Sequence, residues 1–224
     1  MVIEANNKYL SYWRPGHLRW TRIKEEASLL RDVVYFNGKF YAIRWLGDML
    51  VCDFTGGDPT EAQKVAQLPR HQVGDEQYIV ESLGSLFVVA RHGCLVKSRI
   101  PLTPDDEVCD DEVDEKLTFE TRYFRVYKVD LAAGKLTETK ELGDRAIFLG
   151  ANASLSVQAS QFPGVKPNHI YFTDDNYVMY CSYLEGGSLD MGVFNIADDT
   201  IVPHYEGVSL SRYTPPTWVT PTLY

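Results

Sequence analysis

The fold is decided by the stretch Asp32-Val-Val-Tyr-Phe-Asn-Gly-Lys-Phe-Tyr-Ala-Ile43. β-Branched and aromatic residues stand on both sides of Asn37-Gly38, and such residues favour strands. Asn-Gly is the strongest short signal for a two-residue hairpin turn, because both residues of that turn need positive φ angles. The stretch therefore predicts two antiparallel strands joined by a tight turn.

The same order of strands recurs along the chain. The first copy continues through Met49–Phe54 and Ala62–Leu68. The second copy consists of a hairpin and two later strands, at Tyr78–Ala90, Tyr123–Leu131 and Lys135–Leu142. The last copy is predicted at Ala153–Gln158, His169–Thr173, Met191–Ile196 and Thr200–His204. Four short strands per copy form a meander, which is the repeating unit of several all-β folds.

The spacing of the copies indicates a β-propeller. Hairpin glycines Gly38 and Gly84 lie 46 positions apart, whereas Gly84 and Gly150 lie 66 apart. An insertion of roughly twenty residues explains the difference, since propeller repeats have periods of about 40 to 50 residues. A period in this range with four strands per unit is typical of a propeller blade.

We therefore expect an all-β protein, a β-propeller of four-stranded antiparallel blades that is partial, with about three and a half blades. Tyr9–Ile23 resembles only the outer two strands of an earlier blade. Residues 1–224 would form a single domain, with an acidic flexible insertion at 99–120. A two-sheet sandwich is the alternative, because it also has regularly spaced strands.

Composition restricts the class of partner. The 224 residues are 45% hydrophobic and 24% charged, as in ordinary globular proteins. Most of the net charge of −9 comes from the acidic run between Pro104 and Glu115, so the rest of the chain is close to neutral. Nucleic acid is disfavoured as a partner, because binding to phosphates depends on Lys and Arg. The sequence offers neither a long apolar stretch nor a secretory signal, so we expect no membrane partner and a cytoplasmic or nuclear location.

Several motifs together resemble a known family. They are Trp13-Arg-Pro-Gly16 with Trp20, the Asp32–Ile43 stretch, Asn168–Asp175, Gly192–Ile196 and Pro215–Leu223. These residues are similar to those of the plant F-box proteins that carry the domain of unknown function 295, also called the KIB-type β-propeller. The resemblance implies a kelch-like propeller that presents one face to a protein destined for ubiquitination.

The chain departs from that family at its start. Such proteins usually carry an N-terminal F-box, a helical motif that docks a Skp-type adaptor of a ubiquitin ligase. Residues 1–30 contain strand-like aromatic segments instead. We therefore expect no F-box in this chain and no docking of a Skp-type adaptor through it.

The loops between the second and third strands predict a binding face. They span Arg44–Asp48, His92 to about Thr121, and Asp174 to about Gly187. Because all three occupy the same blade position, they should emerge on one side, and insertions in repeat proteins often mark the binding face. The candidate protein-binding residues are Trp45, Arg91, His92, Asp175 and Tyr177. Aromatic residues and Arg dominate interaction hot spots. The alternative is that Trp45 and Tyr177 cover blade edges.

No catalytic residue, metal site or cofactor is predicted. A glycosidase needs two carboxyls facing one cleft, whereas the neighbours Asp174 and Asp175 would point to opposite faces of a strand. The pair Asp198-Asp199 predicts a turn. His92-Gly-Cys94 lacks a second ligand pair for a metal, and the acidic run lacks the ligand spacing of a calcium loop. We expect that run to be a solvated linker.

The sequence thus predicts a non-catalytic protein-interaction module. Two alternatives stay open: a propeller enzyme that processes sugars or small molecules, and a non-functional or dimerising propeller fragment. Near the C-terminus, Trp218 lies within Pro215–Pro221. Proline fixes an extended path, so we expect this segment to lay Trp218 over a blade and to help close the ring; a short proline-rich ligand is the alternative.

Overall fold

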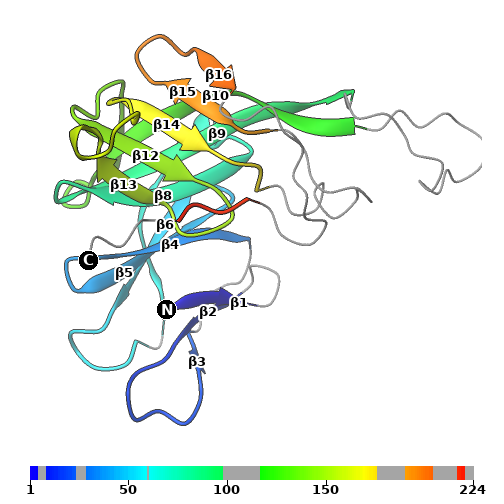
Figure 1. Cartoon of the computed structure of the whole chain (residues 1–224). Coiled ribbons are helices and arrows are strands. Elements are labelled where there is room, and N and C mark those ends of the chain that lie inside the picture. Colours follow the sequence, from blue (N-terminus) through cyan, green and yellow to red (C-terminus); the bar gives the residue numbers. More distant parts are fainter. Residues whose placement is uncertain are drawn as a thin grey trace, which may run out of the picture.

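The computed structural model describes residues 1–4, 9–23, 29–59, 61–97, 117–175, 190–203 and 216–219. Within these residues the chain is nearly all strand, with two short 3₁₀ turns, η1 (Arg70–Gln72) and η2 (Ala159–Gln161). None of the described segments forms a helix long and apolar enough to cross a membrane. The strands form a succession of sheets, which Figure 1 shows following one another along the molecule.

The first two sheets are antiparallel. The first contains β1 (Val2–Glu4), β2 (Tyr9–Tyr12) and β3 (Thr21–Arg22), one strand more than the sequence predicted. The second is the predicted meander of β4 (Leu30–Phe36), β5 (Lys39–Arg44), β6 (Asp48–Asp53) and β7 (Gln63–Gln67). Its hairpin turn has positive φ angles at Asn37 and Gly38, as the Asn-Gly motif requires.

The third sheet has a long central pair of strands. Its order is β11-β10-β9-β8, from β8 (Glu76–Ser82), β9 (Ser85–Lys97), β10 (Leu117–Asp130) and β11 (Lys135–Thr139). The sequence predicted a loop from His92 to about Thr121. The limits predicted for this loop are wrong, because β9 and β10 stay paired out to Lys97 and Leu117. Figure 1 shows this pair extending past the rest of the sheet. Residues 117–120 of the predicted insertion therefore belong to β10, while residues 98–116 lie outside the described part.

The fourth sheet corrects one predicted pairing. It contains β12 (Arg145–Leu149), β13 (Leu155–Gln158), β14 (His169–Phe172), β15 (Gly192–Asn195) and β16 (Ile201–Pro203), in the order β13-β12-β14-β15-β16. The sequence predicted the segment of β13 beside that of β14. That pairing is wrong, because β12 lies between them and pairs in parallel with β14. The sheet thus has a fifth strand that the repeat pattern does not contain.

Side chains from adjacent sheets form the core. Ile79 and Val88 of the third sheet pack against Ile43 and Met49 of the second. The opposite face of the third sheet packs against the fourth, through residues that include Tyr78, Val80, Phe172 and Phe194. Consecutive strand residues point to opposite faces, so a sheet buried on both faces needs an unbroken apolar run. This explains the sequence Phe-Val-Val-Ala at positions 87–90.

Within the described residues, the sheets follow one another in an open arrangement. A separate hydrophobic core lies between each pair of neighbouring sheets. The last sheet also has an outer cluster of Ala146, Ala159 and Tyr171, on which the partly buried Trp218 packs. Ring contacts join Trp218 to Phe148, and its indole N–H donates to the Leu149 carbonyl at 2.8 Å. The predicted packing of Trp218 over a blade is confirmed, whereas its part in closing the ring stays a prediction.

Candidate protein-interaction face

The strand ends that the sequence singled out meet at one end of the sheets. In the second sheet, the backbone N–H of Trp45 donates to the Leu29 carbonyl just before β4. In the third sheet, Glu76 at the start of β8 pairs with Arg91 in β9. An ion pair of 3.1 Å between Arg31 and Glu76 connects these two sheets at this end. We call the surface around Trp45, Arg31, Glu76 and His92 the candidate face.

Arg91 fastens the third sheet to the fourth at this end. Its guanidinium donates to the carboxylates of Asp175, at 2.8 Å, and Asp190, at 2.7 Å. Further acceptors are the Thr121 hydroxyl at 2.6 Å, the Tyr78 hydroxyl at 3.2 Å and the Thr173 carbonyl at 3.1 Å. Asp175 and Asp190 follow β14 and precede β15, so one side chain holds both strand ends.

The surroundings of Arg91 are closed to solvent. Its side chain is 1% exposed, and its guanidinium lies 5.0 Å from the centre of the Phe172 ring. Burial alone would lower the pKa of Arg91, but Tyr78, Asp175 and Asp190 raise it well above its ordinary value. A buried charge is stable only when paired in this way. Arg91 therefore positions the candidate face from beneath and does not present its guanidinium to a partner.

Trp45 supplies exposed apolar surface to the candidate face. It is 42% exposed. Two other exposed apolar residues lie beside it: Leu46, which follows it in sequence, and Leu29, whose carbonyl accepts its backbone N–H. The Arg31 guanidinium lies 5.9 Å from the centre of the Trp45 ring. The turn is pinned behind Trp45 by ion pairs from Arg44 and Lys64 to Asp48. A fixed aromatic side chain beside a charged pair is the type of arrangement that proteins use for binding other proteins.

His92 lies in β9 and stacks on a tyrosine. Its ring centre is 4.4 Å from that of Tyr123 in β10, with the two planes nearly parallel at 15°. Burial lowers the pKa of His92, which keeps the ring neutral near pH 7. The guanidinium of Arg125 also lies 4.5 Å from the centre of the Tyr123 ring. The sequence could not show this stack, because it depends on the register of β9 with β10.

A carboxylate outside the predicted set of contact residues ties three sheets together. Asp32, in β4, accepts hydrogen bonds from the backbone N–H of Ile79 in β8, at 3.0 Å, and from the Ser154 hydroxyl before β13, at 2.6 Å. Burial raises the pKa of Asp32 to about 6, although these donors act in the opposite direction. Burial also raises the pKa of nearby Glu76, to about 7. The charge of Asp175 contributes to both increases.

Two predicted contact residues remain, Asp175 and Tyr177. Asp175 is held by Arg91 and by the Tyr78 hydroxyl, which donates to it at 2.6 Å. Tyr177 lies outside the described residues. Across the described ranges, no three His, Cys, Asp or Glu side chains are placed to hold a metal ion. Of the five candidate residues, the structure thus places Trp45, Arg91, His92 and Asp175 at one end of the sheets.

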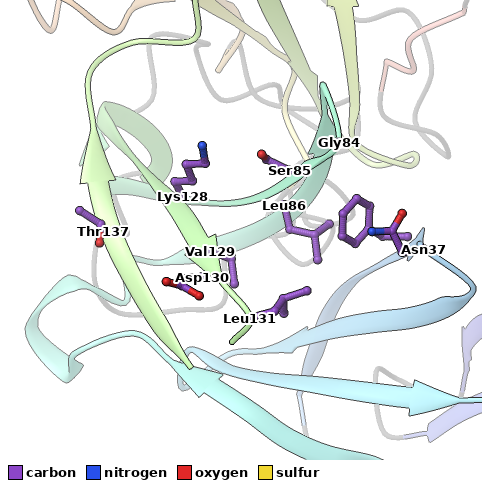
Figure 2. A pocket seen from close by; sticks show the side chains of 10 residues that line it. Asn37, Gly84, Ser85, Leu86, Lys128, Val129, Asp130, Leu131 and Thr137 are labelled. Carbon is purple, nitrogen blue, oxygen red and sulfur yellow. The ribbon is translucent and has the colours of Figure 1, made fainter. Parts of the chain in front are cut away.

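A hollow of about 530 Å³ lies at the opposite end, where the first hairpin turns of two sheets approach each other. Figure 2 shows Leu86, Val129 and Leu131 around it, with the Lys128 amine nearby. The Asp130 carboxylate beside it accepts hydrogen bonds from the backbone N–H groups of Ala132 and Ala133, which fixes the turn. Of the predicted contact residues that the structure describes, none lines this hollow.

Comparisons with known proteins agree with this architecture. A sequence model of the KIB1-4 beta-propeller family matches residues 1–195. The chain therefore belongs to the KIB1-4 β-propeller family, and the resemblance drawn from its motifs is confirmed.

Named relatives come from Arabidopsis thaliana. The chain is 27% identical to the putative F-box protein At5g55150, over 99% of this chain and 56% of that protein. It is 28% identical to the putative F-box protein At1g65770, over 87% of this chain and 48% of that protein. The F-box/kelch-repeat protein At1g64840 is 26% identical over 80% of this chain and 43% of its own length. The chain thus spans about half the length of these curated relatives. No solved structure matches it.

Proposed function

We propose that this chain is a protein-interaction module that binds a partner protein through the candidate face, in the way that the substrate-recognition propeller of a ubiquitin-ligase adaptor would. The observation that carries the proposal is the exposed Trp45, held in place beside the Arg31–Glu76 ion pair. Because its relatives are named as F-box proteins, a role in selecting proteins for ubiquitination is the function that fits best.

The physical argument rests on preorganisation. Arg91 holds the strand ends beneath the candidate face, and Asp48 holds the turn that carries Trp45. A surface whose side chains are already ordered loses less conformational entropy on binding. Exposed Trp45 and Leu46 would supply apolar contact, while the ion pair beside them would set the orientation of the partner. His92 and Tyr123 would extend this contact along β9 and β10.

The test is quantitative binding with matched variants. The purified chain is used to capture proteins from a plant cell extract, and the captured protein is then purified and titrated directly. We expect Trp45→Ala to weaken that binding by roughly tenfold or more, as for a hot-spot residue. Leu83→Ala is the control, because Leu83 is exposed in the opposite turn. Equal affinity of both variants and the unchanged chain would contradict the proposal.

An enzymatic function has one observation in its favour, the neighbouring carboxylates of Asp32, Glu76 and Asp175. Their hydrogen bonds argue against it. Asp32 already accepts from Ile79 and Ser154, and Asp175 is paired with Arg91. A glycosidase needs two carboxyls free to face its substrate. Hydrolysis of aryl glycosides by the purified chain, lost in Glu76→Gln, would replace the interaction proposal.

A further inference from the structure

A second exposed aromatic surface lies in the connection between β2 and β3, residues 13–20, which we call the tryptophan turn. Trp13 is 46% exposed, Trp20 is 51% exposed, and Leu18 is exposed over its whole side chain. The two residues of β3 that follow, Thr21 and Arg22, are exposed as well. Isolated exposed apolar residues are common, but several in one short turn mark an interaction surface.

The turn is fixed to the second sheet by specific contacts. Arg14 forms an ion pair of 3.1 Å with Asp58, and its guanidinium lies 4.8 Å from the centre of the Phe54 ring. The Trp13 indole N–H donates to the His17 carbonyl at 2.8 Å, across the turn. Gly16 has a φ of +94°, which permits this tight path. The exposed side chains are therefore presented by an ordered backbone.

The location of the turn separates it from the candidate face. Asp58 and Phe54 lie in the connection that follows β6, whereas Trp45 precedes β6. The two surfaces thus stand at opposite ends of that strand. A partner bound at Trp45 would leave the tryptophan turn free for a different contact.

The charge of the turn selects the kind of partner. Residues 13–22 include the arginines Arg14, Arg19 and Arg22 and no acidic residue, in a chain whose net charge is −9. Arg14 is neutralised by Asp58, while Arg19 is exposed with no ion-pair partner among the described residues. Fields of exposed charges decay over about 8 Å at physiological salt. A short acidic peptide can bring its carboxylates within this distance of Arg19, whereas binding to an anionic bilayer takes a cluster of about four to eight basic residues.

We propose that the tryptophan turn binds an acidic peptide segment of a partner protein, with an apolar side chain of that segment resting on Leu18 and Trp20 and its carboxylates near Arg19. Trp and Arg supply most of the binding energy in such contacts. The contact requires no rearrangement of the turn, because Asp58 and the His17 carbonyl already hold it. This second surface is independent of the proposed function at Trp45.

The test is fluorescence anisotropy with the full 224-residue chain. The probe is a fluorescein-labelled peptide, Asp-Glu-Leu-Asp-Phe-Asp-Glu, and the comparison peptide has Lys at each acidic position. We expect saturable binding of the acidic peptide and no saturable binding of the lysine peptide. Trp20→Ala and Arg19→Glu should each weaken it about tenfold, the size of a hot-spot loss. The matched control is Trp45→Ala, which removes a similarly exposed tryptophan at the other end of β6 and should leave the affinity for the acidic peptide unchanged.

Several outcomes would overturn the proposal. Absence of saturation by the acidic peptide, equal binding of the lysine peptide, or an equal loss in Trp45→Ala would each do so. Stronger, Trp20-dependent binding to phosphatidylserine vesicles would assign the turn to lipid surfaces instead. Sedimentation velocity gives the remaining outcome: self-association that disappears in Trp20→Ala would identify a second copy of the chain as the occupant.

Discussion

Arg91 in β9 and Asp190 before β15 form a buried ion pair of 2.7 Å, although 99 positions separate them in the sequence. The same guanidinium reaches Asp175, after β14. One side chain therefore holds both the residue that follows β14 and the residue that precedes β15. This relationship links the stability of the third and fourth sheets to the shape of the candidate face.

Replacement of Arg91 by Met should strongly destabilise the fold. The substitution leaves Asp175 and Asp190 buried without their cation, and breaking such pairs costs about 3 to 5 kcal/mol. Urea denaturation followed by tryptophan fluorescence measures the change. Arg122→Met is the control, because Arg122 is an exposed arginine of the neighbouring β10. A loss below about 1 kcal/mol for Arg91→Met would contradict the role given to this pair.

Stability should decrease as the pH rises from 4.5 to about 7. Burial raises the folded-state pKa of Glu76 from 4.5 to about 7, so the folded protein binds a proton that the unfolded chain releases. The stabilisation is complete below pH 4.5 and is lost by about pH 7. Its upper limit is about 3 kcal/mol, from the size of the pKa increase.

Glu76→Gln isolates this effect. The amide cannot ionise, so the variant should show a flatter dependence of the urea midpoint on pH than the unchanged chain does. The raised pKa of Asp32, about 6, has the same sign and would remain in the variant. A steeper pH dependence in Glu76→Gln, or an unchanged one, would show that Glu76 is not the group that titrates.

Two glycines with similar backbone angles should respond differently to substitution. Gly74 and Gly143 have φ angles of +72° and +62°, so alanine is strained at both positions. A Cβ at Gly74 would also lie 2.7 Å from the Arg91 carbonyl, whereas nothing lies within 4 Å of a Cβ at Gly143. We expect Gly143→Ala to cost about 1 kcal/mol, from backbone strain alone. Gly74→Ala should cost at least about 1 kcal/mol more in chemical denaturation, as overpacking does. Equal losses of stability in the two variants would contradict this steric explanation.

Removal of Trp218 should loosen the outer side of the fourth sheet. Trp218→Ala deletes the ring contact with Phe148 and the hydrogen bond to the Leu149 carbonyl. A partly buried tryptophan of this kind contributes about 1 to 3 kcal/mol. Hydrogen exchange should accelerate in β12 and β13 and stay unchanged in β4 and β5. Uniform acceleration in all sheets would mean that the segment stabilises the whole molecule and not one sheet.

Local sequence predicted the hairpins well and predicted pairing between distant strands poorly. Asn37-Gly38 and Leu83-Gly84 have the positive φ angles of tight turns, and both hairpins were found from residues close together in the chain. The parallel pairing of β12 with β14 has no such local signal, since parallel strands need a long connection. The repeat pattern therefore omitted β12.

Prediction of the candidate face from local sequence was limited in the same way. The sequence selected Arg91 because arginine is common in binding hot spots, but its ion pairs with Asp175 and Asp190 bury it. The segment after Arg91 looked like a loop because His92, Gly93 and Cys94 interrupt an apolar run. Backbone pairing continues through it, because an extended ladder requires hydrogen bonds and not apolar side chains.

The parallel pairing of β12 and β14 also determines how the protein would resist mechanical force. In an antiparallel hairpin such as β4–β5, tension on the two chain ends opens one hydrogen bond after another. In the parallel pair, tension enters at the start of β12 and leaves at the end of β14, which are opposite ends of the ladder. The hydrogen bonds between these strands are then loaded together, in shear. The fourth sheet is therefore the part of the described structure where a pulling force should meet its greatest resistance.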